Sequence, residues 1–307
     1  MVQFKYVASA VILLVFLSFA TAQQATPLHL ILLGTGYPYP TAERAGPSCA
    51  VIAGEKVFIV DAGRGAVMRL AATGIPWSAI EAVFLTHLHS DHIDGLPDLY
   101  HCTWQFGNPK PFQLYGPKGT KGIADGMLQF YGPDIHIRRD LTEMIPGDGA
   151  KIEAREIEQG VVYEIPGELR ITAFTVDHHP VEPAFGYRFD SGQHSIVITG
   201  DTKPNPNLVR YAEGADILVQ EAYVLPDSLN GAENRAHWSI YDYHTSAKEA
   251  GETAEKAGVK TLVLTHLIPA SANERDFLEE AQKAFSGKTI VGRDLLSLTT
   301  SDAKKSK

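Results

Sequence analysis

The feature that most constrains this chain is a polar run at residues 86–92, Thr-His-Leu-His-Ser-Asp-His, directly after the apolar stretch 82–85. It places three imidazoles and one carboxylate within six positions, at the end of a predicted buried strand. Imidazole and carboxylate are ligands that zinc prefers. Packed this densely, the same side chains would be costly to bury without a metal, which disfavours a chance cluster of surface or core histidines. The run therefore predicts a metal site at the edge of a sheet.

The backbone of this run separates its donors into two sets. On an extended backbone His87 and His89 point the same way. A turn through Ser90 swings Asp91 and His92 to the other side of the same pocket. Four donors are too many for one ion that keeps an open position, so the spacing predicts a two-metal centre.

Short apolar runs bounded by turn signals alternate with helical patterns along the rest of the chain, which predicts one layered α/β domain. A chain of 307 residues with 44% hydrophobic content can bury a large core, and we expect two similar halves. Strands are predicted over residues 29–33, 50–53, 57–60, 82–85, 112–115, 169–176, 184–189, 195–199, 217–220 and 261–265. Helices are predicted over residues 66–72, 97–104, 123–130, 246–257 and 274–285, with Gly258 as a C-cap.

Polar side chains recur where these predicted strands end. Rigid strands can aim ligands that loops alone could not hold. The alternative is that each is an isolated turn residue, as Asp often is. The residues that follow an apolar run are Asp61, His87, His178, Asp201, Glu221 and His266.

The run Thr-His-Leu-His-Ser-Asp-His-Ile-Asp-Gly-Leu at 86–96 resembles the signature of the metallo-β-lactamase superfamily. The resemblance implies a four-layer αββα sandwich with a dinuclear metal site at one edge. Other segments resemble the remaining superfamily motifs in the expected order, at residues 33–36, 60–63, 178, 200–202 and 264–266. Within the superfamily, residues 114–117, 219–222 and 244–247 resemble the ribonuclease Z-like branch, which includes phosphodiesterases and some secreted arylsulfatases. The similarity covers roughly residues 28–298.

The resemblance implies a ligand set for each of two zinc ions, with Mn²⁺ or Fe²⁺ as alternatives. His87, His89 and His178 would hold the first ion. Asp91, His92 and His266 would hold the second, and Asp201 would bridge both. His179 is the alternative to His178, because both imidazoles follow the same strand. Strand alternation favours His178, which leaves His179 to face the substrate or to support a ligand.

The resemblance also implies the catalytic roles. Two ions close together lower the pKa of a shared water, and the resulting hydroxide attacks the substrate. Asp91 takes a proton from the nucleophile, while His244 with Glu221 delivers a proton to the leaving oxygen. The alternative for His244 is a helix cap, although Thr245 is the better N-cap by residue type. We expect Asp61 to orient a ligand histidine and Gly63 to permit close backbone approach.

Two departures from the family pattern bear on the substrate. In ribonuclease Z, an arm that binds tRNA is inserted between the Gly-Tyr-Arg and Gly-Asp-Thr motifs. Here the corresponding residues 186–188 and 200–202 are separated only by a hairpin-length segment. The histidine usual before the Glu-Ala pair is Gln220. The chain has 27 basic and 36 acidic residues, which disfavours general nucleic-acid affinity.

We therefore expect a zinc hydrolase of small anionic esters, either phosphodiesters or aryl sulfates, with no nucleic-acid partner. The alternatives are a β-lactam or lactone hydrolase and a non-catalytic metal-binding protein. An aromatic wall for an aryl group is a further hypothesis, and core packing is its alternative. The aromatic candidates are Trp104, Phe106, Tyr223 and Trp238. A homodimer is expected only from the frequency of dimers among relatives.

The N-terminal segment resembles a signal peptide. Lys5 precedes an apolar stretch at 6–19, and Ala-Thr-Ala at 20–22 fits a cleavage site. This pattern predicts a periplasmic or secreted protein with no stable membrane insertion, in which the hydrolase domain spans 23–301 and residues 302–307 form a disordered tail. An uncleaved membrane anchor is the alternative. Cys49 and Cys102 could pair in an oxidising compartment or stay separate.

Overall fold

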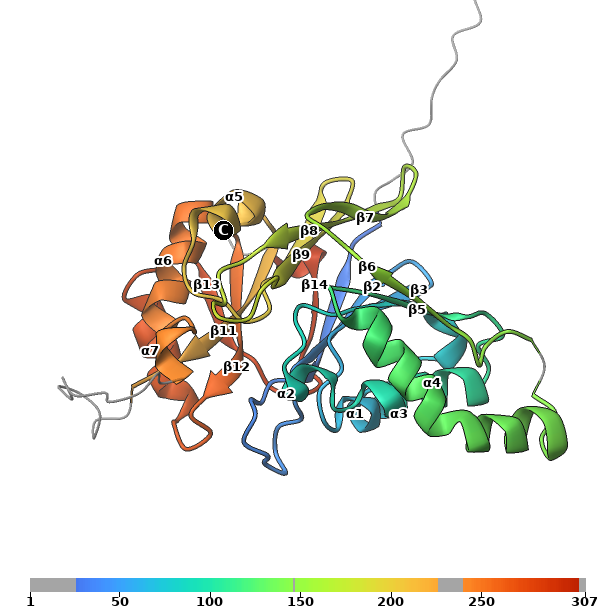
Figure 1. The fold of residues 1–307 in the computed structure, drawn as a ribbon. Coiled ribbons are helices and arrows are strands. Elements are labelled where there is room, and N and C mark those ends of the chain that lie inside the picture. The colour runs from blue at the N-terminus through green and yellow to red at the C-terminus, as the bar shows by residue number, and fades with distance from the viewer. Residues whose placement is uncertain (1–25, 146, 226–239, 304–307) are drawn as a thin grey trace, which may run out of the picture.

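Two mixed β-sheets lie face to face at the centre of the computed structural model, which describes residues 26–145, 147–225 and 240–303 (Figure 1). In this part of the chain each sheet has seven strands. The first has the order β14-β1-β2-β3-β4-β5-β6, formed by Ser297–Thr299, His29–Gly34, Ser48–Ala53, Lys56–Val60, Ile80–Phe84, Phe112–Gly116 and Ile152–Glu156. The second has the order β13-β12-β11-β10-β9-β8-β7, formed by Lys288–Val291, Thr261–Ile268, Ile217–Tyr223, His194–Ile198, Phe185–Ser191, Leu169–Thr175 and Gly160–Ile165.

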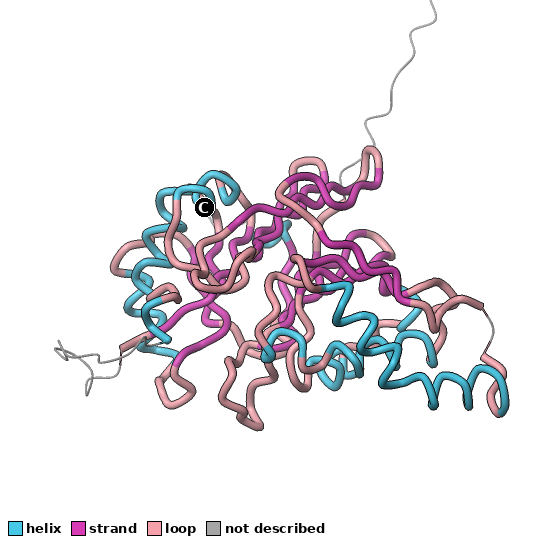
Figure 2. The backbone as a smooth tube through the Cα atoms, in the orientation of Figure 1, coloured by secondary structure: helices cyan, strands magenta, loops and turns pink. Residues whose placement is uncertain are grey.

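Helices cover the outer faces of both sheets, as Figure 2 shows. The first sheet carries α1 (Ala66–Ala72), α3 (Leu96–Gln105) and α4 (Thr120–His136), and the short α2 (Ser90–Ile93) lies at its edge. The second sheet carries α5 (Pro206–Ala212), α6 (Ala247–Ala257) and α7 (Glu274–Gln282). Short elements complete the list: η1 (Trp77–Ala79), η2 (Ile137–Leu141), η4 (Ile240–Asp242) and α8 (Thr300–Ala303).

Three apolar clusters separate these four layers. One lies between the sheets and includes Phe58, Phe84 and Phe189, whose rings lie 6.3–6.4 Å apart. A second lies between the first sheet and its helices, and the third lies between the second sheet and α5–α7. Alternating side chains of each strand thus enter two different cores, as a sheet buried on both faces requires. The αββα sandwich expected from the sequence is confirmed.

Helix α6 shows how local sequence sets a boundary. Ser246 is its N-cap and accepts from the backbone N–H of Glu249, whose side chain returns the bond as a capping box. The expectation that Thr245 caps this helix is wrong, because the Thr245 hydroxyl is buried and donates to the carbonyl of Thr202. Gly258 ends the helix at φ 63°, as predicted.

The elements that the sequence did not predict are half-exposed, short or rich in helix breakers. Strands β6 and β7 have no buried position, and β13 and β14 have only four and three residues. Helix α4 is longer than predicted, although it contains three glycines and Pro133. Helix α5 begins at Pro206, a residue that favours the first turn, and Asn205 caps it. Tertiary packing overrides weak local propensity in these segments.

The predicted terminal segments are only partly within the described residues. Residues 1–22 and 304–307 lie outside them. Asp302 and Ala303, which were expected in a disordered tail, belong to α8. Among the described residues, no helix is long and apolar enough to cross a membrane. Cys49 is buried between the sheets and Cys102 lies on α3, and both are free thiols.

Candidate metal centre

The polar strand ends of both sheets meet at one edge of the sandwich. The run at 86–92 follows β4, while His178 and Asp201 lie just beyond β8 and β10. Glu221 is in β11, His266 is in β12, and His244 comes just before α6. Gly200 (φ 62°) lets the two sides approach, since a Cβ there would lie 2.6 Å from the Cβ of Thr86. All the side chains that the sequence assigned to metal binding therefore meet in one place.

Group one contains His87, His89, His178 and Asp201, whose donor atoms all lie within 4.8 Å of one another. His89 Nδ1 is 3.0 Å from His87 Nε2 and 3.4 Å from His178 Nε2. Asp201 Oδ2 lies 3.7 Å from His87 Nε2 and 3.9 Å from His178 Nε2. This is the set that the resemblance assigned to the first ion.

Group two contains Asp91, His92 and His266, together with the same Asp201. His266 Nε2 lies 3.3 Å from both Asp91 Oδ2 and Asp201 Oδ2. His92 Nε2 lies 3.2 Å from Asp201 Oδ2 and 3.7 Å from Asp91 Oδ2. Asp201 therefore touches both groups, which is the position a bridging ligand needs.

The chemistry of the donors fits divalent metal ions. Burial lowers the pKa of His87 and His89, and it lowers the pKa of His178 to about 4, so these imidazoles keep a free lone pair at neutral pH. Burial opposes ionisation of Asp201, but the neighbouring His266 and His92 outweigh it and lower its pKa. Asp201 Oδ1 is buried and makes no hydrogen bond with the described residues. Nitrogen and carboxylate donors without thiolate suit zinc.

Asp61 holds His92 of group two in place through a hydrogen bond. Its carboxylate accepts from the backbone N–H and the hydroxyl of Thr86 and from Nδ1–H of His92, each at 2.8 Å. Burial lowers the pKa of His92, but the charges of Asp201 and Asp61 outweigh this and raise it. The orienting role expected of Asp61 is consistent with these contacts. Gly63 also packs tightly, because a Cβ there would lie 2.4 Å from the carbonyl oxygen of Asp91.

The structure separates His178 from its neighbour His179. His178 is fully buried, and its Nδ1–H donates to the backbone carbonyl of Tyr243 at 3.1 Å. The side chain of His179 is 57% exposed and lies 3.3 Å from Glu182. Only His178 lies within group one.

The pair His244 and Glu221 lies beside both groups. His244 Nδ1 is 2.5 Å from Glu221 Oε2, and both side chains are buried. Glu221 also accepts from the backbone N–H of Thr202 at 2.6 Å. Burial and the charge of Asp201 raise the pKa of Glu221, and burial lowers that of His244. Because Glu221 holds Nδ1, the Nε2 atom of His244 is the one left for a substrate.

Gln220 in β11 and His266 in β12 carry buried polar atoms that sequence reasoning did not explain. The amide of Gln220 is fully buried and has no partner among the described residues, nor has His266 Nδ1. Glu221 and His244 also lie within 4.8 Å of Asp201 and His266. The hydrogen bond between His244 and Glu221 supports their assignment as a proton-transfer pair rather than as further metal ligands.

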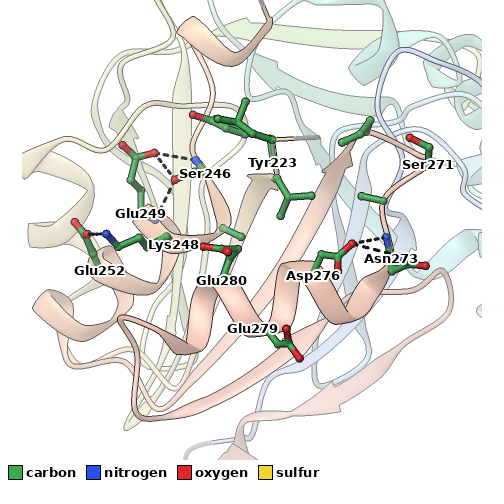
Figure 3. Close-up of a pocket in the computed structure, with 15 residues that line it drawn as sticks. Tyr223, Ser246, Lys248, Glu249, Glu252, Ser271, Asn273, Asp276, Glu279 and Glu280 are labelled. Atoms are coloured by element: carbon green, nitrogen blue, oxygen red, sulfur yellow. Dashed lines mark hydrogen bonds and ion pairs between the residues drawn. The ribbon is translucent and has the colours of Figure 1, made fainter. Parts of the chain in front are cut away.

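Of the four aromatic candidates, the three that the structure describes do not form a wall beside the ligands. Trp104 is buried in the core, Phe106 is 63% exposed at the end of α3, and Trp238 lies outside the described residues. Tyr223 lines a cavity of about 780 Å³ between α6 and α7, where Figure 3 shows it among acidic side chains. No member of group one or two lines that cavity. Tyr243, which the sequence reading missed, is an aromatic residue whose ring lies 5.3 Å from that of the ligand candidate His178.

Comparisons with known proteins agree with this geometry. The family described as "Beta-lactamase superfamily domain" matches residues 57–267. The ribonuclease Z of Mycobacterium bovis (strain BCG / Pasteur 1173P2) is 40% identical over 277 residues, which are 87% of this chain and 96% of the relative. The ribonuclease Z of Mycobacterium sp. (strain KMS) is 41% identical over 276 residues, 87% of this chain and 94% of the relative.

Solved structures share the fold. The metallo-β-lactamase fold protein YhfI of Bacillus subtilis has a TM-score of 0.69 at 23% identity, covering 89% of this chain and 99% of that one. The short form of human tRNase Z has a TM-score of 0.65 at 21% identity, covering 88% and 98%.

The expected periplasmic or secreted location is wrong. The relatives that align over 87% of this chain are named ribonuclease Z, a name that carries no indication of export. The signal-peptide pattern that led to this expectation lies outside the described residues.

Two metal-ligating groups at the edge of an αββα sandwich, a family match over residues 57–267 and relatives at 40% identity lead to one assignment. This chain belongs to the β-lactamase superfamily of metal-dependent hydrolases, in the family of the ribonucleases Z.

Proposed function

We propose that this protein is a metal-dependent phosphodiesterase that acts on small phosphodiesters. The observation that carries the proposal is the buried His244–Glu221 pair, whose imidazole lies 3.9 Å from the shared ligand Asp201. A phosphodiester has a leaving oxygen that needs a proton, and this pair can supply one beside the ligand groups. The name of the relatives, ribonuclease Z, supports phosphodiester chemistry.

Group one and group two would each hold a divalent ion, with Asp201 between them. Such ions polarise the phosphoryl oxygens and lower the pKa of water at this position. Asp91 faces the same site and accepts a proton from the attacking water. The water oxygen forms a bond to phosphorus, the P–O bond to the leaving group breaks with its electron pair on the leaving oxygen, and His244 Nε2–H donates a proton there. Glu221 holds Nδ1–H throughout and keeps the imidazole aligned.

Two features favour a small substrate over RNA. Strands β9 and β10 join through a tight turn at Gly192 and Gln193, so the hairpin has no extension with which to hold a large polymer. The net charge of −9 also opposes a polyanion. RNA is the second candidate substrate, and the name of the relatives favours it.

A substrate panel tests the proposal on protein with measured zinc content. It contains bis(p-nitrophenyl) phosphate, p-nitrophenyl sulfate, nitrocefin, a lactone and a tRNA precursor, each with and without chelator. We expect chelator-sensitive turnover of the phosphodiester above all others. A dominant rate on the sulfate, the lactam or the lactone would contradict the proposal, cleavage of the precursor would support RNA, and zinc binding without turnover would indicate a non-catalytic metal-binding protein.

A further inference from the structure

Tyr243 occupies a defined place beside the ligand groups. It follows η4 and directly precedes His244, and its backbone carbonyl accepts from His178 Nδ1–H at 3.1 Å. Its ring centroid lies 5.3 Å from that of His178 in an edge-on arrangement and 4.8 Å from that of His244. The Tyr243 ring therefore packs against two imidazoles, and its backbone carbonyl is held by a hydrogen bond from one of them.

The Tyr243 side chain is half-buried, so part of it remains open to a ligand. The half-exposed ring thus lies beside the rings of both His178 and His244.

This placement has a consequence for the leaving group. A leaving oxygen within hydrogen-bonding reach of His244 carries its substituent next to the adjacent ring. A planar substituent can stack on that ring or meet its edge, whereas an alkyl substituent gains much less. Among the described residues, the nearby Tyr223 and Tyr241 rings pack against each other at 5.0 Å.

We propose that Tyr243 determines the specificity of this site for esters with a planar, aromatic leaving group, by contacting that group while His244 protonates its oxygen. The inference rests on the proposed phosphodiesterase function for the identity of the leaving group. It replaces the aromatic wall that the sequence suggested, with a different residue in that role.

The test measures binding, so that it does not depend on turnover. Phenylphosphonate and methylphosphonate are titrated calorimetrically into zinc-loaded protein. The phenyl group can lie on either side of the site. Loss of the preference for phenylphosphonate in a Tyr243 variant would place the phenyl group against Tyr243. We expect the wild type to bind phenylphosphonate about five- to tenfold more tightly, and Tyr243→Ala to bind the two within about twofold.

Three further variants sharpen the result. Tyr243→Phe keeps the ring and is expected to keep the preference. Tyr243→Leu keeps bulk without planarity and is expected to lose it, which covers the case in which the alanine variant folds poorly. Tyr241→Ala removes a ring of the same turn that contacts Tyr223, and it is expected to keep the preference. Zinc content and thermal unfolding are measured for each protein.

An unchanged preference in both Tyr243→Ala and Tyr243→Leu overturns the inference, as does a wild type with no preference. The proposed function is tested separately by turnover of bis(p-nitrophenyl) phosphate. A protein with the Tyr243-dependent preference but no turnover of phosphodiesters would contradict the proposed function and leave the ring contact in place.

Discussion

The two ligand groups of this centre are supported by different chemistry. In group two, His92 Nδ1–H donates to the buried carboxylate of Asp61 at 2.8 Å. In group one, His178 Nδ1–H donates to a neutral backbone carbonyl at 3.1 Å, and His87 Nδ1 lies 3.0 Å from the hydroxyl of Thr86. His92 of group two is thus hydrogen-bonded to an anion, whereas His178 and His87 of group one are hydrogen-bonded to neutral oxygens.

This difference changes how each group holds protons and metals. An anionic partner makes an imidazole a stronger base and a stronger ligand. Burial without an anionic partner instead lowers the pKa, as for His178. We infer that group one presents neutral imidazoles over a wide pH range, while group two binds its ion through a more basic and more firmly oriented His92.

The largest expected effect comes from removing the residue that the groups share. Asp201→Ala should reduce zinc content from two ions to fewer than one per chain and lower activity by about three orders of magnitude or more. Elemental analysis and turnover of bis(p-nitrophenyl) phosphate check both values. Wild-type zinc content in this variant would contradict the bridging assignment.

Removing a single ligand of group one should leave group two largely loaded. His178→Ala is expected to lose about one zinc ion per chain and most of the activity, since the fully buried His178 lies within group one. His179→Ala is the matched control, because the exposed side chain of His179 should be replaceable with little loss of zinc or activity. The reverse result would exchange the two assignments.

His244→Ala should leave both zinc ions in place and slow turnover by about a hundredfold for a poor leaving group. Activated nitrophenyl esters should lose far less, because a good leaving group needs no proton. The ratio of kcat values for the two substrate classes is the measurement. Equal losses would show that His244 is not the proton donor.

Asp61→Asn should weaken zinc binding to group two by about ten- to a hundredfold and affect group one much less, since only Thr86 connects Asp61 to His87. The change removes the charge that orients His92, and it also disturbs two hydrogen bonds from Thr86. Competition with a chromogenic chelator measures the two affinities. Asp94→Asn, which breaks a surface ion pair with Arg64, is the control. Equal weakening of both sites would remove the distinction between the groups.

The smallest effect is a difference in proton affinity without metal. An NMR titration of the metal-free protein should find His92 protonated above pH 6.5 and His178 neutral down to about pH 4. By linkage, the raised pKa of His92 stabilises the metal-free fold fully below the unfolded value of 6.5, and this is lost as pH rises through the folded pKa. The lowered pKa of His178 acts oppositely, since stability is lost as pH falls from 6.5 towards 4. Similar pKa values for the two imidazoles would contradict this account.

Sequence reasoning succeeded where local pattern and chemistry coincide. The polar run after β4 and the polar ends of β8, β10 and β12 predicted which side chains meet, because strand period and apolar runs mark where strands end. It failed at β6 and β7, where no position is buried and the apolar pattern is therefore weak. It also failed for the aromatic residue at the site, because Trp104, Phe106 and Tyr223 lie near motif strands in sequence but not beside the ligands in space.

From the amino-acid sequence alone come the donor types, their order along the chain and the sandwich that unites them, since these follow from residue chemistry and short periodicities. Only the tertiary structure decides which of His178 and His179 turns inward, that Asp61 holds His92 and that Tyr243 lies against two imidazoles. The Asp61–His92 and His178–Tyr243 contacts join residues 31 and 65 positions apart in the chain, and their geometry depends on how two sheets pack rather than on any local pattern.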